Sequence, residues 1–142
     1  MRRVCSECHA VNRIPARHLA DVGRCGKCRA TLPPQGAPIE VVSEAQFDDI
    51  IAGARVPVLV DFWATWCGPC RAVAPEVKKA AGSLAGRAVV LKVDTDALDE
   101  LARRYRVSSI PSFAVFHAGR LVHQRVGAMD ARQLERFAIA PQ

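Results

Sequence analysis

One stretch of the chain carries most of the information about its fold. It reads Val58-Leu59-Val60-Asp61-Phe62-Trp63-Ala64-Thr65-Trp66-Cys67-Gly68-Pro69-Cys70. The first part is an apolar run interrupted by Asp61, which is typical of a buried β-strand. The last part places Pro69 where the first turn of a helix needs no N–H donor. The stretch therefore predicts a buried strand followed directly by a helix, with two cysteines at the junction.

The remainder of residues 39–142 alternates predicted strands with predicted helices. Strands are expected at residues 39–42, 56–63, 88–93, 112–116 and 121–126, and helices after Ser43, from about 68 to 84, around 98–105 and after Asp130. Ser43 and Asp130 are each followed three residues later by glutamine, which is the capping-box pattern. This order predicts an α/β fold, with a mixed central β-sheet flanked by helices.

A proline-rich segment separates these elements from the front of the chain. Residues 31–38 contain three prolines and a glycine, which neither continue a helix nor fit a central strand. We therefore expect a front module at residues 1–30, a linker at residues 31–38 and a main domain at residues 39–142. The front module is too short and too poor in large apolar residues to fold unaided, so it needs a cross-link or a metal ion.

The front module contains two cysteine pairs of the same spacing, Cys5/Cys8 and Cys25/Cys28. Two Cys-x2-Cys pairs separated by sixteen residues match a tetrahedral four-thiolate zinc site. Such a site has no open position, so we expect one structural zinc ion. The alternatives are four free thiols or two disulfides. Because His9 follows Cys8, the c-type haem attachment pattern is also present, but that attachment requires export and we expect no export signal.

The third pair, Cys67 and Cys70, predicts thiol–disulfide chemistry. Cys67 lies at a predicted helix N-terminus, where unpaired N–H groups and the helix macrodipole favour a thiolate. Cys70 lies one turn further along and is placed to contact the same sulfur. Asp61 interrupts the preceding strand, and a buried carboxyl group has a raised pKa suited to proton transfer near neutral pH. An aspartate satisfied by a structural partner is the alternative for Asp61.

Residues from about 39 to 140 resemble the thioredoxin family. The matching motifs, in order, are Val58-Leu59-Val60-Asp61-Phe62-Trp63-Ala64, Trp66-Cys67-Gly68-Pro69-Cys70, Pro75, Lys92-Val93-Asp94, Ile110-Pro111-Ser112-Phe113, Gly119 and Val126-Gly127. The four-cysteine segment resembles the N-terminal zinc-binding extension of the bacterial thioredoxin 2 type. Ser112 is a departure, since many members have threonine there. The resemblance implies a thioredoxin fold with a small zinc-ribbon-like N-terminal module.

The same resemblance implies roles for individual residues. Cys67 would attack a substrate disulfide, and Cys70 would resolve the mixed disulfide that forms. Asp61, with Lys92 nearby, would exchange the proton of the resolving thiol. Pro111 would be a cis-proline beside the cysteines, next to backbone that pairs with the substrate. The surface expected to bind substrate consists of Trp66, Gly68, Pro69, Ile110, Pro111 and Gly127.

These observations predict a monomeric, cytoplasmic protein-disulfide reductase that receives electrons from a thioredoxin reductase. A disulfide isomerase or oxidase on the same fold, and a zinc-dependent binding adaptor or holdase, are the alternatives. The net charge of +6 is spread along the chain, so no nucleic-acid partner is expected. No apolar run approaches the roughly 20 residues of a membrane span, so no membrane partner is expected. Without a G-x-G-x-x-G motif, no bound nucleotide is expected.

Overall fold

Strand β6 (Val58–Trp63) is the central strand of a five-stranded sheet in the computed structural model, which describes residues 1–140. It pairs in parallel with β7 (Val89–Asp94) and antiparallel with β8 (Ser112–His117). Beyond β7 lies β5 (Ile39–Glu40), which is parallel, and beyond β8 lies β9 (Arg120–Val126), which is antiparallel. The strand order β5-β7-β6-β8-β9 is the mixed sheet that the sequence predicts.

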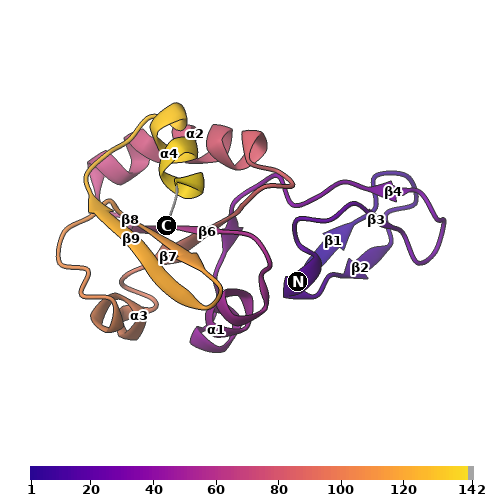
Figure 1. The fold of residues 1–142 in the computed structure, drawn as a ribbon, viewed down its shortest axis with the longest axis horizontal. Helices are drawn as coiled ribbons and strands as arrows, with labels where there is room; N and C mark the ends of the chain where they lie inside the picture. Colours follow the sequence, from indigo (N-terminus) through magenta and orange to yellow (C-terminus); the bar gives the residue numbers. More distant parts are fainter. Residues whose placement is uncertain (141–142) are drawn as a thin grey trace.

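Helices cover both faces of this sheet (Figure 1). Val60 and Phe62 of β6 point into the core beneath α1 and α3, whereas Leu59 points into the core beneath α2 and α4. Burial on both faces explains why β6 is a nearly continuous apolar run. The helices are α1 (Glu44–Gly53), α2 (Gly68–Ser83), α3 (Asp99–Arg104) and α4 (Ala131–Ile139).

The helix starts predicted at Ser43 and Asp130 are confirmed, but the complete capping box forms only at Asp130, because the Gln46 side chain accepts from the backbone N–H of Val42 instead of Ser43. Ser43 Oγ accepts a hydrogen bond from the backbone N–H of Gln46 at 3.1 Å. Asp130 forms a complete capping box, in which its carboxylate accepts from the backbone of Gln133 and the Gln133 side chain accepts from the backbone of Asp130. Helix α2 continues through Pro75 to Ser83 rather than ending at the proline.

The front of the chain forms two short antiparallel hairpins beside the main sheet (Figure 1). Strand β1 (Arg2–Val4) pairs with β2 (Val11–Arg13), and β3 (Gly23–Arg24) pairs with β4 (Thr31–Leu32). The 3-10 helix η1 (Ala16–His18) lies between the hairpins in the chain. The first two residues of the predicted linker thus form a strand of the second hairpin.

The segment between the hairpins is docked on the main domain. Leu19 is 1% exposed and belongs to the same apolar core as Phe47 of α1. Gly53 at the end of α1 allows a close approach, because a Cβ atom there would lie 2.9 Å from Cβ of Ala16. The Arg3 guanidinium donates to the carbonyl oxygen of Leu19 at 3.3 Å. The boundaries at residues 30 and 38 stay a prediction, but the main core extends across them to Leu19.

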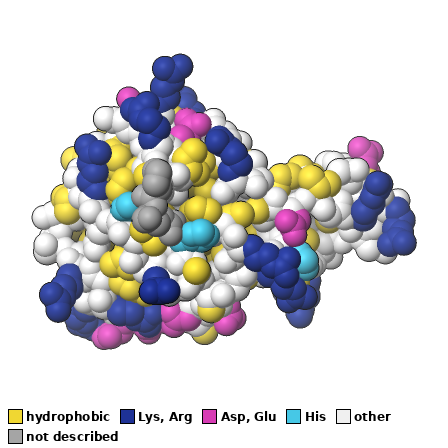
Figure 2. All heavy atoms as spheres, in the orientation of Figure 1, with side chains coloured by type: hydrophobic (Ala, Val, Ile, Leu, Met, Phe, Trp, Pro, Cys, Tyr) yellow, Lys and Arg dark blue, Asp and Glu magenta, His cyan; other side chains and the backbone are white. Residues whose placement is uncertain are grey.

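The surface carries charge of both signs, with 20 lysines and arginines against 14 acidic residues in the chain. On the face drawn in Figure 2, the basic side chains occur in several separate groups over the main sheet and the front hairpins. Among residues 1–140, no helix is long and apolar enough to cross a membrane.

Candidate functional site

A disulfide joins Cys67 and Cys70 at the N-terminus of α2. Cys67 is the N-cap residue, and its Sγ accepts a hydrogen bond from the backbone N–H of Cys70 at 3.1 Å. Both cysteines are almost fully buried. When the bond is reduced, this N–H group and the positive end of the helix dipole stabilise a thiolate on Cys67.

A cis peptide bond between Ile110 and Pro111 lies beside this pair. Sγ of Cys67 is 3.8 Å from the carbonyl oxygen of Ile110. The backbone N–H of Gly127 donates to the carbonyl oxygen of Pro111 at 2.9 Å. Gly127 has φ of +109°, a conformation that favours glycine. The structure therefore brings the end of β9 and the start of β8 to the edge where Cys67 lies.

The surface around the disulfide is formed in part by Trp66, whose side chain is 67% exposed. Gly68 and Pro69 are also exposed. The indole Nε1 of Trp66 donates to Oδ2 of Asp96 at 3.0 Å, which orients an otherwise free ring. The sequence analysis missed Asp96, because it follows β7 in a polar turn and only the tertiary fold places it beside Trp66.

Asp61 lies in β6, in a buried position 1% exposed. It points to the same sheet face as Leu59, which is the face covered by α2. Its Oδ1 has no hydrogen-bond partner within the described part of the chain. Burial raises the pKa of Asp61 to about 7, and the opposing positive charge of Lys92 does not cancel this effect. The carboxyl group can therefore gain or lose a proton near neutral pH.

Lys92 lies in β7 directly beside Asp61 in the sheet register. Its Nζ is 3.5 Å from Oε1 of Glu40 and 4.6 Å from the ring centroid of Trp63. The sequence analysis missed Glu40, because nothing in the local pattern indicates that β5 pairs with β7. Only that pairing places Glu40 opposite Lys92.

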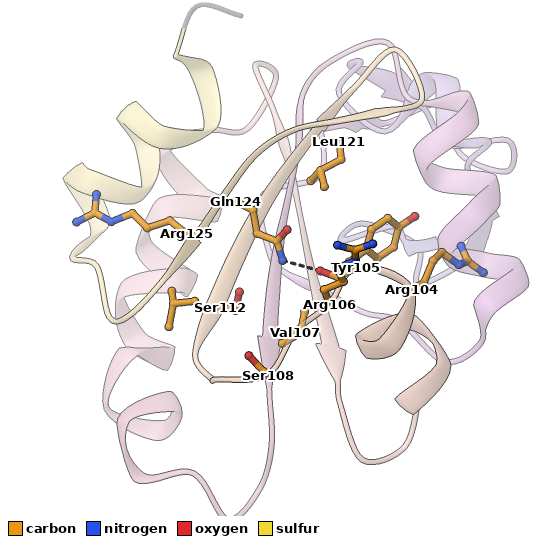
Figure 3. A pocket seen from close by; sticks show the side chains of 10 residues that line it. Arg104, Tyr105, Arg106, Val107, Ser108, Ser112, Leu121, Gln124 and Arg125 are labelled. Carbon is orange, nitrogen blue, oxygen red and sulfur yellow. Dashed lines mark hydrogen bonds between the residues drawn. The ribbon is translucent and has the colours of Figure 1, made fainter.

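A cavity of about 440 Å³ lies between β9 and the segment that follows α3 (Figure 3). Tyr105, Arg106 and Leu121 line it, and Nε2 of Gln124 donates to the carbonyl oxygen of Tyr105 at 2.9 Å. Its described lining includes no cysteine and neither Asp61 nor Lys92. This cavity therefore does not house the redox chemistry.

The four cysteines of the front hairpins converge on one point. All four Sγ atoms lie within 4.8 Å of one another. The Cys5–Cys28 and Cys8–Cys25 sulfur distances are both 3.6 Å. A tetrahedral zinc ion with Zn–S bonds of about 2.3 Å separates its sulfur ligands by roughly 3.8 Å. The arrangement therefore fits a four-thiolate metal site.

Asn12 connects the two halves of this cluster. Its Oδ1 accepts from the backbone N–H of Gly26 at 2.9 Å, and its Nδ2 donates to Sγ of Cys25 at 3.6 Å. Backbone N–H groups of Cys28 and Lys27, together with Asn12, lower the pKa of Cys25 to about 6. The thiolate that a metal ion requires is therefore favoured at Cys25. At Cys28, the backbone N–H of Ala30 is outweighed by burial and the neighbouring cysteine sulfurs, which raise the pKa to about 12. The sequence analysis missed Asn12, which belongs to no motif.

Replacing Asn12 by alanine is expected to weaken metal binding by about tenfold or more, because groups that orient metal ligands typically contribute this much. Competition with a chromophoric chelator measures the affinity. Thr31→Ala, at an exposed position of the second hairpin, is the control. Equal affinities of the two variants would show that Asn12 does not support the site.

A strand–helix junction with a buried cysteine pair joined by a disulfide, a cis-proline and a mixed sheet together define a thiol–disulfide oxidoreductase. Residues 38–140 match the family described as thioredoxin, and residues 4–30 match the one described as thioredoxin 2, N-terminal. The chain belongs to the thioredoxin family. It is an enzyme, a protein-disulfide reductase. Its N-terminal cysteine cluster fits a zinc-ribbon module.

Individual relatives agree with this assignment. Thioredoxin C-3 of Corynebacterium nephridii is 36% identical over 134 residues, which cover 94% of this chain and 90% of the relative. A bifunctional thioredoxin reductase/thioredoxin of Mycobacterium leprae is 43% identical over 101 residues, which cover 71% of this chain and 22% of that protein.

Solved structures of thioredoxins are similar to most of this chain. A mutant thioredoxin from Halobacterium salinarum has a TM-score of 0.68 and 33% identity, with 73% of this chain and 89% of that chain covered. Plasmodium falciparum thioredoxin has a TM-score of 0.65 and 35% identity, with 70% and 99% covered. The predicted thioredoxin fold is thereby confirmed.

Proposed function

We propose that this chain reduces disulfides of other proteins with the Cys67/Cys70 dithiol, and that its front cysteines hold one structural zinc ion. The observation that carries the proposal is the Cys67–Cys70 disulfide at the N-terminus of α2, with Cys67 next to the cis Ile110–Pro111 bond. The oxidised pair seen here is the product of the reaction.

Cys67 begins the reaction as the nucleophile. In the reduced protein its thiolate attacks one sulfur of a substrate disulfide, forms a mixed disulfide and releases the other substrate sulfur as a thiolate. Cys67 suits this role because the start of α2 stabilises a negative charge on its sulfur. Ile110 offers its carbonyl oxygen beside that sulfur, where a substrate backbone can pair with it as an added strand.

Cys70 completes the reaction. Its thiol loses a proton and attacks Sγ of Cys67, so that the Cys67–Cys70 disulfide forms and the second substrate sulfur leaves as a thiolate. Two electrons have then passed from the protein to the substrate. Asp61 accepts the proton of Cys70, since its pKa of about 7 matches the operating pH. Lys92 contributes a positive charge beside that carboxylate.

The surface proposed to receive the substrate consists of Trp66, Gly68, Pro69, Ile110, Pro111 and Gly127. Its composition is mostly apolar or backbone, which suits many substrates of different sequence. The Trp66 ring, oriented by Asp96, supplies its largest exposed apolar area. Because the surface has few charged groups, contact with substrate rests mainly on backbone pairing and apolar burial.

Zinc is the metal that the front cysteines fit best. Cys5, Cys8, Cys25 and Cys28 would supply four thiolates, which satisfy the tetrahedral preference of Zn²⁺ and leave no site for a substrate. The ion would contribute folding energy to hairpins whose own apolar core is very small. We assign it no step in the reaction.

The electrons are proposed to come from a thioredoxin reductase in the cytoplasm. The Mycobacterium leprae relative, whose name joins thioredoxin reductase and thioredoxin, supports such a donor. Insulin reduction with NADPH and a bacterial thioredoxin reductase tests the proposal. NADPH oxidation that depends on this protein is expected, and none in the presence of active reductase would contradict it. A redox titration that places the pair near the potential of an oxidase would instead favour the alternative direction.

Replacing Asp61 by asparagine is expected to slow resolution of the mixed disulfide by about tenfold or more at pH 7, because general bases typically contribute at least that much. In the original protein the rate should rise through pH 7 as Asp61 ionises, and the variant should lose this inflection. Quenched-flow release of a thiol from a preformed mixed disulfide measures the rate. Identical pH profiles would make Asp61 a structural residue.

The same substitution should also stabilise the oxidised protein above pH 7. The folded-state pKa of Asp61 is raised, so the folded protein binds more protons than the unfolded chain between about pH 4 and 7, and its stability falls as the pH rises through that range. Asparagine removes this penalty. Urea unfolding at pH 5 and pH 8 checks the sign.

A further inference from the structure

We propose that Glu40 is a positioning residue for Asp61. It holds the Lys92 ammonium group toward the edge strand β5 and so keeps Lys92 from pairing with the Asp61 carboxylate. This inference rests on the proposed role of Asp61 as proton acceptor. It adds a residue outside the motifs that the thiol chemistry uses.

The sheet register carries the inference. Glu40 of β5 is aligned with Lys92 of β7, and Lys92 is aligned with Asp61 of β6. Aligned residues of parallel neighbours point to the same sheet face, so the three side chains form a row of acid, base and acid. That face is the one covered by α2, since Asp61 points the same way as Leu59.

The distances show which acid Lys92 contacts. Its Nζ lies 3.5 Å from Oε1 of Glu40, whereas Oδ1 of Asp61 has no hydrogen-bond partner among the described residues. The Trp63 ring, 4.6 Å from Nζ, supports the ammonium group in this place. Lys92 is thus held by an exposed carboxylate and an aromatic ring, while the buried carboxyl group beside it keeps an unpartnered oxygen.

An open cavity of about 600 Å³ is lined by Glu40 and Lys92, whereas its described lining does not include the buried Asp61. Its charged lining comprises Glu40 from β5, Lys92 from β7, and Arg71 and Lys78 from α2. Arg71 and Lys78 are exposed, so water screens their charges more strongly than that of Lys92. Glu40 and Lys92 are the charged groups aligned with Asp61 through the sheet register, and they act on it with opposite sign.

Removing Glu40 has two consequences, and both lower the pKa of Asp61. A negative charge near Asp61 disappears, and Lys92 becomes free to approach the buried carboxylate. Each change favours the ionised form of Asp61, in agreement with the raising effect of Glu40 and the lowering effect of Lys92 on the pKa of that group. The proton acceptor should therefore ionise at lower pH without Glu40.

The test is Glu40→Gln in the full-length, metal-loaded protein. Carboxyl ¹³C NMR of the oxidised form, in which Cys67 and Cys70 are joined and do not titrate, is expected to show the Asp61 titration moving down by about 0.5 to 1 pH unit. The inflection in the pH profile of mixed-disulfide resolution should move by the same amount. In Glu40→Asp, which keeps the negative charge, the downward shift should be at most half of that in Glu40→Gln.

Asp49→Asn is the matched control, because it removes the same charge from an exposed position on α1, on the opposite face of the sheet. It should leave the titration of Asp61 in place. In a Lys92→Gln background, Glu40→Gln should shift the titration of Asp61 by less than it does alone, since no ammonium group is left to approach the Asp61 carboxylate. Circular dichroism confirms that each variant is folded.

An Asp61 titration that moves no further in Glu40→Gln than in Asp49→Asn would overturn this inference. An equal shift with and without Lys92 would also overturn it, because Glu40 would then act by its charge alone. Neither result touches the proposed reduction of disulfides, which the insulin assay tests. Conversely, an unchanged rate of mixed-disulfide resolution in Asp61→Asn would contradict the proton-acceptor role of Asp61. The NMR shift would still test whether Glu40 controls the ionisation of Asp61 through Lys92.

Discussion

Replacing Cys67 by serine is expected to lower the rate of insulin reduction by about 1,000-fold or more, because a hydroxyl group does not ionise near neutral pH and is a far weaker nucleophile than a thiolate. The position of Cys67 at the start of α2, with the N–H of Cys70 directed at its sulfur, stabilises a thiolate that serine cannot replace. The NADPH-coupled assay measures the loss.

Cys70→Ser is the matched comparison, since it removes the other thiol and leaves the nucleophile in place. This variant should form the mixed disulfide and fail to resolve it, so that substrate proteins stay bound until a reducing agent is added. Affinity capture followed by elution with dithiothreitol detects them. Capture by Cys67→Ser but not by Cys70→Ser would mean that the two roles are reversed.

Removal of the metal is expected to unfold the two front hairpins, because their buried side chains comprise little more than Cys5, Cys25 and Leu32. The main sheet has its own core on both faces and should remain folded. Its stability should nevertheless fall, since Leu19 fills part of that core and is connected to the hairpins through Arg3.

Metal analysis of freshly purified protein, followed by chelation and thermal unfolding, tests this expectation. One zinc per chain and a lower melting temperature after chelation are the expected results. Leu19→Ala should cost about 2 to 5 kcal/mol in the metal-loaded protein, as is usual for a buried leucine. Leu121→Ala, which truncates a side chain that is 42% exposed, is the control. Protein without zinc whose hairpins are still ordered would contradict the structural role.

Much of the fold follows from signals that are local in the sequence. The apolar run of β6 and the cysteines after it define a strand–helix junction within thirteen residues, residues 58–70. Ser43 and Asp130 start their helices through hydrogen bonds to residues three positions away. Such patterns can be predicted because all the interacting groups lie within one turn of the chain.

The predicted end of one strand was less accurate, since the strand expected at residues 39–42 ends at Glu40. A further short strand, β4, covers Thr31 and Leu32, where no strand was expected. Thr31 and Leu32 are strand residues because they pair with Gly23 and Arg24, and Leu32 is buried with Cys5 and Cys25. Prolines at positions 33 and 34 end that strand but do not exclude it.

Four features can be predicted from the amino-acid sequence: the fold class, the redox pair, the four-cysteine cluster and the unusual buried carboxylate at Asp61. Each depends on the spacing or the polarity of residues that are close together in the sequence. Four contacts could be found only in the folded chain: Glu40 lies beside Lys92, Asn12 contacts Cys25, Trp66 donates to Asp96, and Leu19 fills the main core. The residues in these contacts are far apart in the sequence: Asn12 and Cys25 are separated by 13 positions, and Glu40 and Lys92 by 52. Their partners are chosen by strand order and register, which depend on how the whole chain buries its apolar surface.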